Sequence, residues 1–147
     1  MVSVSASVAW WARTEPLRLA LVYGEQRLSY GQLQGRVQAA AALLARHGVG
    51  EGDVVALLMK NSAAFVELAL AVSHVGAVLL PINYRLSAPE VDYIVGHAGA
   101  VLLLCDDEFS AAAPASVPHL AIDGAAQQGG QALTGAAQAV PAPCLRR

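Results

Sequence analysis

The sequence predicts an α/β fold in which an N-terminal hairpin is followed by alternating strands and helices that build a mainly parallel sheet. Short apolar runs at 53–59 and 101–105 are typical of buried strands, 77–82 is a further strand, and segments with helical periodicity separate the three. Strands that alternate with helices pair in parallel through right-handed crossovers. A chain of 147 residues is long enough to bury a sizeable core.

The first elements are a hairpin and a long helix. Residues 19–22 and 26–28 flank a turn that contains Gly24, which favours a β-hairpin. Ser29 then begins a helix, because its hydroxyl can cap the amide of Gln32 while the Gln32 side chain reaches back. This helix is expected to end at Gly48, and its apolar face holds Tyr30, Leu33, Val37, Ala40, Ala41 and Leu44.

Two further helices separate the later strands. One begins at Ser62 and ends at Gly76, and its predicted core face holds Phe65, Leu68, Ala69 and Val72. The other begins at Ser87, where Glu90 completes a second capping box, and reaches about His97.

The composition changes after this α/β region. Residues 1–109 carry the strand and helix patterns, whereas 110–147 are rich in Ala, Gly, Gln, Ser and Pro. Such a segment has few residues from which to build a core, so we expect a linker or a poorly ordered tail. Within it, 120–123 is the one stretch that suggests a short strand.

Charge and hydropathy exclude several classes of protein. The nine Lys and Arg residues are scattered and the net charge is −2, so no nucleic-acid partner is expected. The apolar stretch 65–82 is interrupted by Glu67, His74 and Pro81, which argues against a transmembrane segment. Hydrophobic residues make up 56% of the chain and exceed the usual share of about 45–50%, so we expect an apolar face that something else covers.

The cysteines and the N-terminus indicate a cytoplasmic protein. Cys105 and Cys144 have neither the spacing of a metal site nor the density of a disulfide framework, which points to a reducing compartment. No basic leader precedes the early apolar residues, since the first cation is Arg13, so a secretory signal is not expected.

The most informative motif is the run Gly-Ala-Val-Leu-Leu-Pro-Ile-Asn-Tyr-Arg-Leu at 76–86. It places Pro81, Asn83 and Arg85 directly after an uncharged strand, where open α/β sheets bind their ligands. Together with Leu-Ser-Tyr-Gly-Gln-Leu at 28–33, it resembles the N-terminal part of the AMP-forming acyl-CoA synthetases, within the adenylate-forming, AMP-binding superfamily. The resemblance covers about residues 10–107, and Gln32 stands where the family often has Glu.

This resemblance implies an enzyme whose complete form activates a carboxylic acid, most simply a fatty acid, with ATP and transfers it to CoA. ATP, Mg²⁺ and CoA are therefore implied for the complete enzyme. The family's Ser/Thr/Gly-rich phosphate loop with its lysine is missing from these 147 residues, so we expect a truncated chain that is inactive alone, has no catalytic residue or cofactor of its own, and associates with the remainder of the synthetase or another protein.

Arg85 is the one residue that the resemblance implicates in substrate binding, because the matching arginine of some members approaches the CoA nucleotide phosphates. A guanidinium suits phosphate, since its planar fork donates two parallel charge-assisted hydrogen bonds. The alternative is a structural arginine that binds the adjacent loop or Glu90.

Other candidate sites are better explained as structure. The glycine-rich segment 48–52 precedes a strand, whereas a phosphate-binding loop must follow one. Residues 106–108 offer three adjacent carboxylates but no full oxygen cage for a cation. The histidines lie on separate elements, and Cys105 lacks an adjacent base, so neither a metal site nor nucleophilic catalysis is expected.

Two alternatives of other classes stay open. The chain could be a non-catalytic α/β binding or interaction module that uses an exposed apolar face of its sheet. It could also be a nucleotide-binding α/β domain, for which binding of NAD or ATP in equilibrium dialysis is the discriminating observation.

Overall fold

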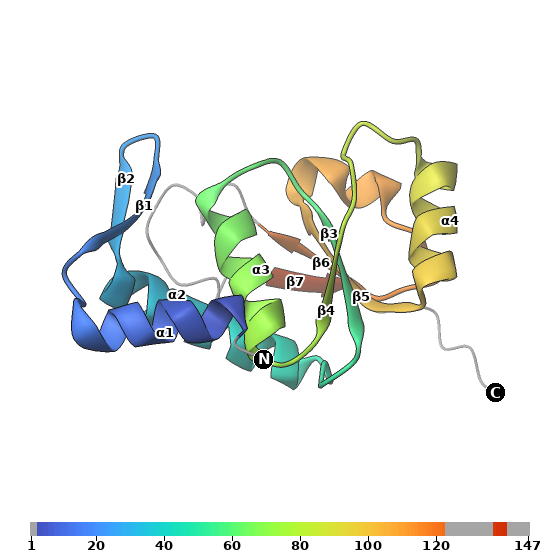
Figure 1. The fold of residues 1–147 in the computed structure, drawn as a ribbon. Coiled ribbons are helices and arrows are strands. Elements are labelled where there is room, and N and C mark those ends of the chain that lie inside the picture. Colours follow the sequence, from blue (N-terminus) through green and yellow to red (C-terminus); the bar gives the residue numbers. More distant parts are fainter. Residues whose placement is uncertain (1–2, 123–136, 141–147) are drawn as a thin grey trace.

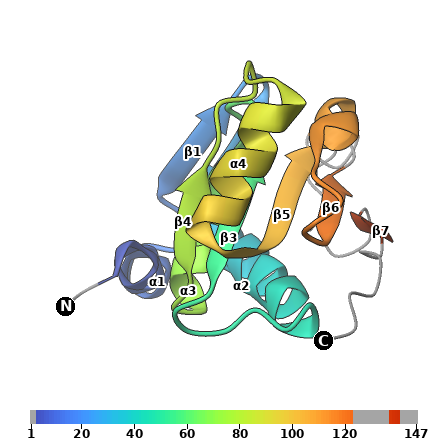
Figure 2. The ribbon, with the colours of Figure 1, turned by 90° about the vertical axis from the view of Figure 1, so that its right-hand side faces the viewer.

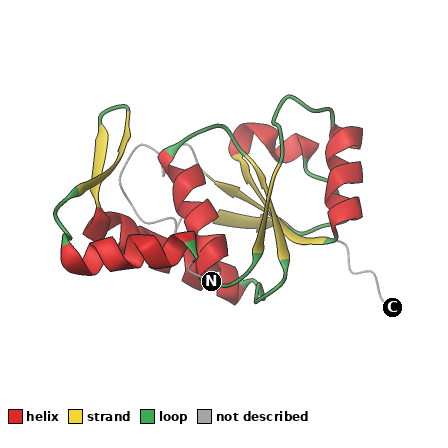
Figure 3. Cartoon of the chain, in the orientation of Figure 1, coloured by secondary structure: helices red, strands yellow, loops and turns green. Residues whose placement is uncertain are grey.

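Two sheets and four α-helices make up residues 3–122 and 137–140, which are the residues that the computed structural model describes (Figures 1 and 3). The larger sheet runs, in spatial order, through β4 (Val78–Pro81), β3 (Val54–Leu58), β5 (Ala100–Asp106), β6 (His119–Ile122) and β7 (Ala137–Val140). Neighbours from β4 to β6 pair in parallel, and β7 pairs with β6 antiparallel. The predicted α/β fold with a mainly parallel sheet is therefore confirmed.

Helices cover both faces of this sheet (Figure 2). On one face lie α2 (Tyr30–Arg46) and α3 (Ala63–His74), and on the other lie α4 (Ala88–Ala98) and the 3-10 helix η1 (Asp107–Ala112). Val55 and Leu57 of β3 belong to the core under α2 and α3. Ala56 and Leu58 belong to the core under α4, so β3 is buried on both sides, as a central parallel strand requires.

The predicted hairpin and the start of α2 are confirmed. Strands β1 (Leu19–Tyr23) and β2 (Gln26–Ser29) pair antiparallel around Gly24, whose φ of 56° suits glycine. The Ser29 hydroxyl accepts a hydrogen bond from the Gln32 amide at 3.3 Å, and the Ser29 amide donates to Gln32 Oε1 at 2.9 Å. This reciprocal capping fixes where α2 begins.

The structure contains a first helix, α1 (Val4–Thr14), that the sequence analysis did not predict. Its cap is Ser3, whose hydroxyl accepts from the Ala6 amide at 3.2 Å. The helix packs against α2 and α3, and the Trp11 ring lies 5.8 Å from the Tyr30 ring and 4.5 Å from the Arg18 guanidinium. These tertiary contacts stabilise α1 against the rest of the fold.

The predicted core face of α3 is partly wrong. Phe65 and Ala69 were expected in the core, but both are only half-buried and line a surface hollow. Glu67 is fully buried instead and faces Arg36 of α2, with Arg36 Nε 2.7 Å from Glu67 Oε1. A carboxylate can occupy this core position because a guanidinium from the neighbouring helix compensates its charge.

The segment after residue 109 contributes to the sheet where the structure describes it. The short strand expected at 120–123 is present as β6, whose Leu120 and Ile122 are buried in the core under α2 and α3. Residues 123–136 and 141–147, which include Cys144, lie outside the described residues. The division at residue 109 and the linker or tail after it stay predictions.

Candidate functional site

Residues that follow three parallel strands lie together at the edge of the larger sheet formed by the carboxyl ends of these strands. Because β3, β4 and β5 are parallel, the segments that follow them lie at the same edge. Lys60 follows β3, Asn83 to Arg85 follow β4, and Asp107 and Glu108 follow β5. We call this set the carboxyl edge. The sequence motif around Arg85 is therefore placed where open α/β sheets bind ligands.

Arg85 is exposed at the end of a turn that its neighbours fix. The Arg85 amide donates to Asn83 Oδ1 at 3.1 Å, and the Leu86 amide donates to the Asn83 carbonyl at 3.1 Å. The Arg85 guanidinium lies 5.7 Å from the centroid of the Tyr84 ring. This contact engages the charge of the guanidinium but none of its N–H donors.

Glu90, the expected structural partner of Arg85, is engaged within its own helix. Its Oε2 accepts from the Ser87 amide at 2.8 Å and from the Ser87 hydroxyl at 2.7 Å. These hydrogen bonds stabilise the ionised carboxylate and hold the pKa of Glu90 below its usual range. Among the ion pairs between described residues, none joins Arg85 to Glu90.

Two aromatic rings and a lysine lie beside this turn. Tyr84 stacks on Phe109 of η1, with centroids 5.4 Å apart and an interplanar angle of 24°. Lys60 Nζ lies 5.9 Å from the Tyr84 centroid and 5.6 Å from the Phe109 centroid. The same ammonium is 2.8 Å from Glu108 Oε1, and the hydrogen bond to Glu108 raises the pKa of Lys60.

Three acidic residues lie at the end of β5 and directly after it. Asp106 Oδ2 accepts a hydrogen bond of 2.8 Å from the Lys60 amide, which ties the end of β5 to the end of β3. With Asp107 and Glu108 it borders a hollow of about 250 Å³ that Lys60 also lines. Among the described residues, no three His, Cys, Asp or Glu side chains gather in a way that could hold a metal ion.

The remaining residues that the sequence singled out are dispersed. The glycine-rich segment 48–52 joins α2 to β3, and its Gly50 amide donates to Asp53 Oδ2 at 2.8 Å, as a connecting turn does. His47 and His74 are exposed near the ends of different helices. Cys105 is buried in β5, and burial raises the pKa of its thiol, which keeps it protonated.

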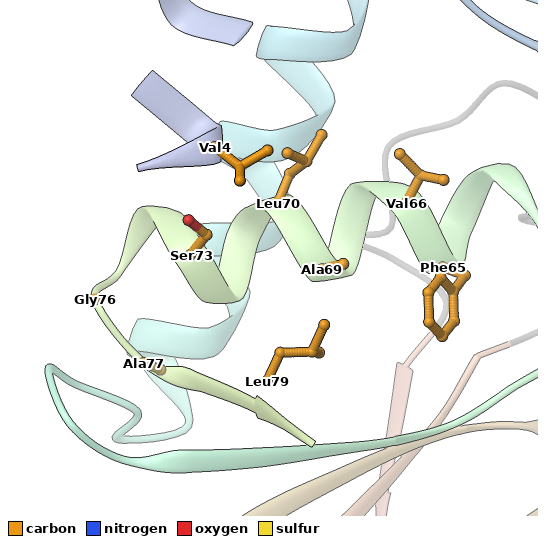
Figure 4. A pocket seen from close by; sticks show the side chains of 9 residues that line it. All are labelled: Val4, Phe65, Val66, Ala69, Leu70, Ser73, Gly76, Ala77 and Leu79. Atoms are coloured by element: carbon orange, nitrogen blue, oxygen red, sulfur yellow. The ribbon is translucent and has the colours of Figure 1, made fainter. Parts of the chain in front are cut away.

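An apolar hollow opens beside β4, the outermost strand of the larger sheet on the side away from β7. Figure 4 shows Val4 of α1, Leu70 of α3 and Leu79 of β4 around it. It measures about 510 Å³, and its other lining residues are Phe65, Val66, Ala69, Ser73, Gly76 and Ala77. The hollow is one apolar surface among the described residues, and the apolar face expected from the composition stays a prediction. Within the described residues, no helix is both long and apolar enough to cross a bilayer.

Sequence reasoning placed Arg85 but missed Tyr84, whose ring lies by the Arg85 guanidinium, and Phe109 and Lys60, which contact that ring. Tyr84 and Phe109 are 25 positions apart in the sequence, so their contact depends on how β4 and β5 are arranged in the sheet. The available signal was position alone, because Lys60 and Tyr84 each follow an apolar strand.

Comparisons with known proteins identify the family of this chain. A family model described as AMP-binding enzyme matches residues 8–143. A 2-succinylbenzoate–CoA ligase of Geobacillus sp. (strain WCH70) is 37% identical over 95 residues, which are 65% of this chain and 19% of that protein. The fatty acid–[acyl-carrier-protein] ligase ScoC of Streptomyces coeruleorubidus is 36% identical over 103 residues, 70% of this chain and 20% of that protein.

Solved structures show the same fold. The N-terminal domain of FACL13 from Mycobacterium tuberculosis superposes with a TM-score of 0.78 and 27% identity, covering 100% of this chain and 39% of that one. A fatty acyl CoA synthetase of the same organism gives a TM-score of 0.78 and 28% identity, covering 98% of this chain and 30% of that one. The chain spans about a fifth of the length of the curated relatives described above.

Proposed function

Because the chain belongs to the AMP-binding enzyme family, we propose that it is the N-terminal part of a ligase that activates a carboxylic acid with ATP and transfers the acyl group to CoA. The family match over residues 8–143 carries this proposal. In such a reaction the carboxylate attacks ATP to give an acyl-adenylate and pyrophosphate, and the CoA thiol then displaces AMP. The complete enzyme would use ATP, Mg²⁺ and CoA, as membership of this family implies.

For the acid we propose a fatty acid. Support comes from the structural likeness to the M. tuberculosis fatty acyl CoA synthetase, which covers 98% of this chain. Other relatives are named for aromatic acids, among them a 3-hydroxybenzoate–CoA ligase of Aromatoleum sp. (strain CIB), 33% identical over 120 residues. An acid panel of fatty and hydroxybenzoic acids therefore separates the two substrate classes.

For Arg85 we propose a contact with a phosphate of the CoA nucleotide. The guanidinium is exposed at the carboxyl edge, and its contact with the Tyr84 ring leaves its N–H donors available. Each such charge-assisted hydrogen bond contributes about 1.5–3 kcal/mol. The family resemblance of the motif at 76–86 and this exposure together support the role.

For the apolar hollow beside β4 we propose the rest of the ligase chain as the cover. The hollow is lined almost entirely by apolar side chains, and the relatives extend well beyond the region that this chain matches. A chain that remains monomeric without exposing an apolar patch would favour the interaction module instead.

A cytoplasmic location stays the expectation from the cysteines.

The proposal is tested in a ligase that carries this chain as its N-terminal region. We expect ATP–pyrophosphate exchange that depends on the acid, followed by thioester formation with CoA. The 147 residues alone should give no exchange above a control without enzyme, because they contain no lysine-bearing phosphate loop. Exchange by the isolated chain, lost on mutation of that chain, would contradict the proposal. Transfer to acyl carrier protein but not to CoA would contradict the choice of acceptor.

A further inference from the structure

We propose that Tyr84 is a positioning residue for CoA binding, whose ring holds the Arg85 guanidinium at the carboxyl edge. The inference rests on the proposed function of Arg85. It assigns a role to the residue between Asn83 and Arg85, and through it to residues that follow β3 and β5. Tyr84 acts through Arg85 and makes no contact with the ligand itself.

The Tyr84 ring is itself held in place by residues from two other segments. Phe109 of η1 stacks on it at 5.4 Å, and Lys60 Nζ lies 5.9 Å from its centroid. Glu108, next to Phe109, keeps Lys60 at this position with an N–O distance of 2.8 Å. The ends of β3 and β5 thus fix a ring that belongs to the turn after β4.

The turn fixes the backbone of Arg85, and the Tyr84 ring contacts the guanidinium at the far end of the side chain. Asn83 Oδ1 accepts from the Arg85 amide at 3.1 Å, which fixes the Arg85 backbone. The guanidinium then lies 5.7 Å from the Tyr84 centroid. An ion pair with a carboxylate would occupy the N–H donors, whereas contact with an aromatic ring leaves them free for a phosphate.

The expected effect is modest because the contact is exposed. A free arginine loses side-chain freedom when it binds, and a ring that already restricts it reduces this loss. A cation–π contact at an exposed site corresponds to an affinity change of about two- to fivefold. The Tyr84 contribution should therefore be smaller than that of Arg85, and it should vanish when Arg85 is absent.

The test is a double-mutant cycle in the ligase that contains this chain. Four variants are compared with the parent enzyme: Tyr84→Leu, Tyr84→Phe, Arg85→Ala and the double variant Tyr84→Leu/Arg85→Ala. The KM for CoA and the kcat of thioester formation are measured, with ATP–pyrophosphate exchange as the measure of the adenylation half-reaction. Phe109→Leu, which disturbs the ring without touching the turn, is the second test of the same idea.

We expect Tyr84→Leu to raise the KM for CoA about two- to fivefold with exchange unchanged. Tyr84→Phe should keep the parent KM, since the aromatic face remains. Phe109→Leu should raise the KM in the same direction. In the Arg85→Ala background, Tyr84→Leu should add no further change.

Four results would overturn the inference. An equal Tyr84→Leu effect with and without Arg85 would show that the ring binds the ligand directly. A parallel loss of exchange and thioester formation would show that the ring supports the fold. If Arg85→Ala raises the KM while Tyr84→Leu and Phe109→Leu do not, the inference fails and the proposed role of Arg85 stands. An unchanged KM for CoA in Arg85→Ala would contradict both the inference about Tyr84 and the proposed role of Arg85.

Discussion

Two ion pairs of nearly equal length lie in very different surroundings. Arg36 and Glu67 are 2.7 Å apart between α2 and α3, and their side chains are 8% and 0% exposed. Lys60 and Glu108 are 2.8 Å apart at the carboxyl edge, and their side chains are 50% and 54% exposed. The first pair is part of the core under the sheet, and the second borders the turn that carries Arg85.

The difference in burial predicts that the two ion pairs contribute differently to folding stability. A buried pair leaves an uncompensated charge when one partner is removed, so it is tied to folding. An exposed pair is screened by water and salt, and it contributes little to stability. We therefore expect substitutions in the interior to change the free energy of unfolding, and substitutions at the carboxyl edge to change ligand binding.

The largest effect is expected from Glu67→Ala. Removal of this carboxylate leaves the Arg36 guanidinium buried without its partner, which costs about 3–5 kcal/mol in free energy of unfolding. Urea denaturation of the 147-residue chain measures it. A loss no greater than that of an exposed substitution would mean that water reaches Arg36.

A similar loss is expected from Leu33→Ala in the same layer. Leu33 of α2 is 4% exposed and belongs to the core under α2 and α3, and a buried Leu→Ala change costs about 2–5 kcal/mol. Phe65→Ala is the matched comparison, and it should cost less because the ring is half-buried beside the open hollow. If Phe65→Ala were the more damaging change, the hollow would be part of the core.

The pH dependence of stability should identify Glu67. Burial raises the pKa of this carboxyl, although the charge and the hydrogen bond of Arg36 oppose the shift. The folded state therefore holds the proton more tightly than the unfolded chain, and the resulting stabilisation is complete below the usual value of 4.5. It is lost as the pH rises through the folded pKa.

The control for this titration is Glu67→Gln, which cannot ionise. The difference in unfolding free energy between the parent chain and this variant should fall as the pH rises from below 4.5 toward neutrality. A difference that rises with pH would show that Arg36 dominates and lowers the pKa.

The smallest effect on stability is expected from Lys60→Ala. The lysine and Glu108 are both half-exposed, so the pair is well solvated. The midpoint of denaturation should stay within the error of the measurement. A shift comparable to that of Leu33→Ala would show that the carboxyl edge is structural, and the contrast between the two pairs would be lost.

Local sequence signals predicted much of this fold. The capping residues Ser29 and Ser62 and the uncharged runs placed α2, α3 and the strands β3, β4 and β5. The uncharged run at 77–82 placed Arg85 just after the end of a strand. Each of these features depends on neighbours within a few residues of the same segment.

The missed features depend on contacts between segments. The helix α1 is stabilised by its packing on α2 and α3, and Glu67 is buried because Arg36 of another helix faces it. The stack of Tyr84 on Phe109 requires β4 and β5 to lie on either side of β3. A single sequence shows which residues are present but not which residues of different segments contact one another.

Arg85→Ala tests the division between the two charged regions most directly. In the ligase, the kcat/KM for CoA should fall about tenfold to a hundredfold while ATP–pyrophosphate exchange stays unchanged, because one charge-assisted hydrogen bond is lost from the thioester-forming step. Arg85→Lys should recover part of this, since the charge remains without the planar fork. The unfolding free energy of the 147-residue chain should match the parent. Equal losses in both half-reactions, together with a destabilised chain, would contradict the account and make Arg85 a structural residue.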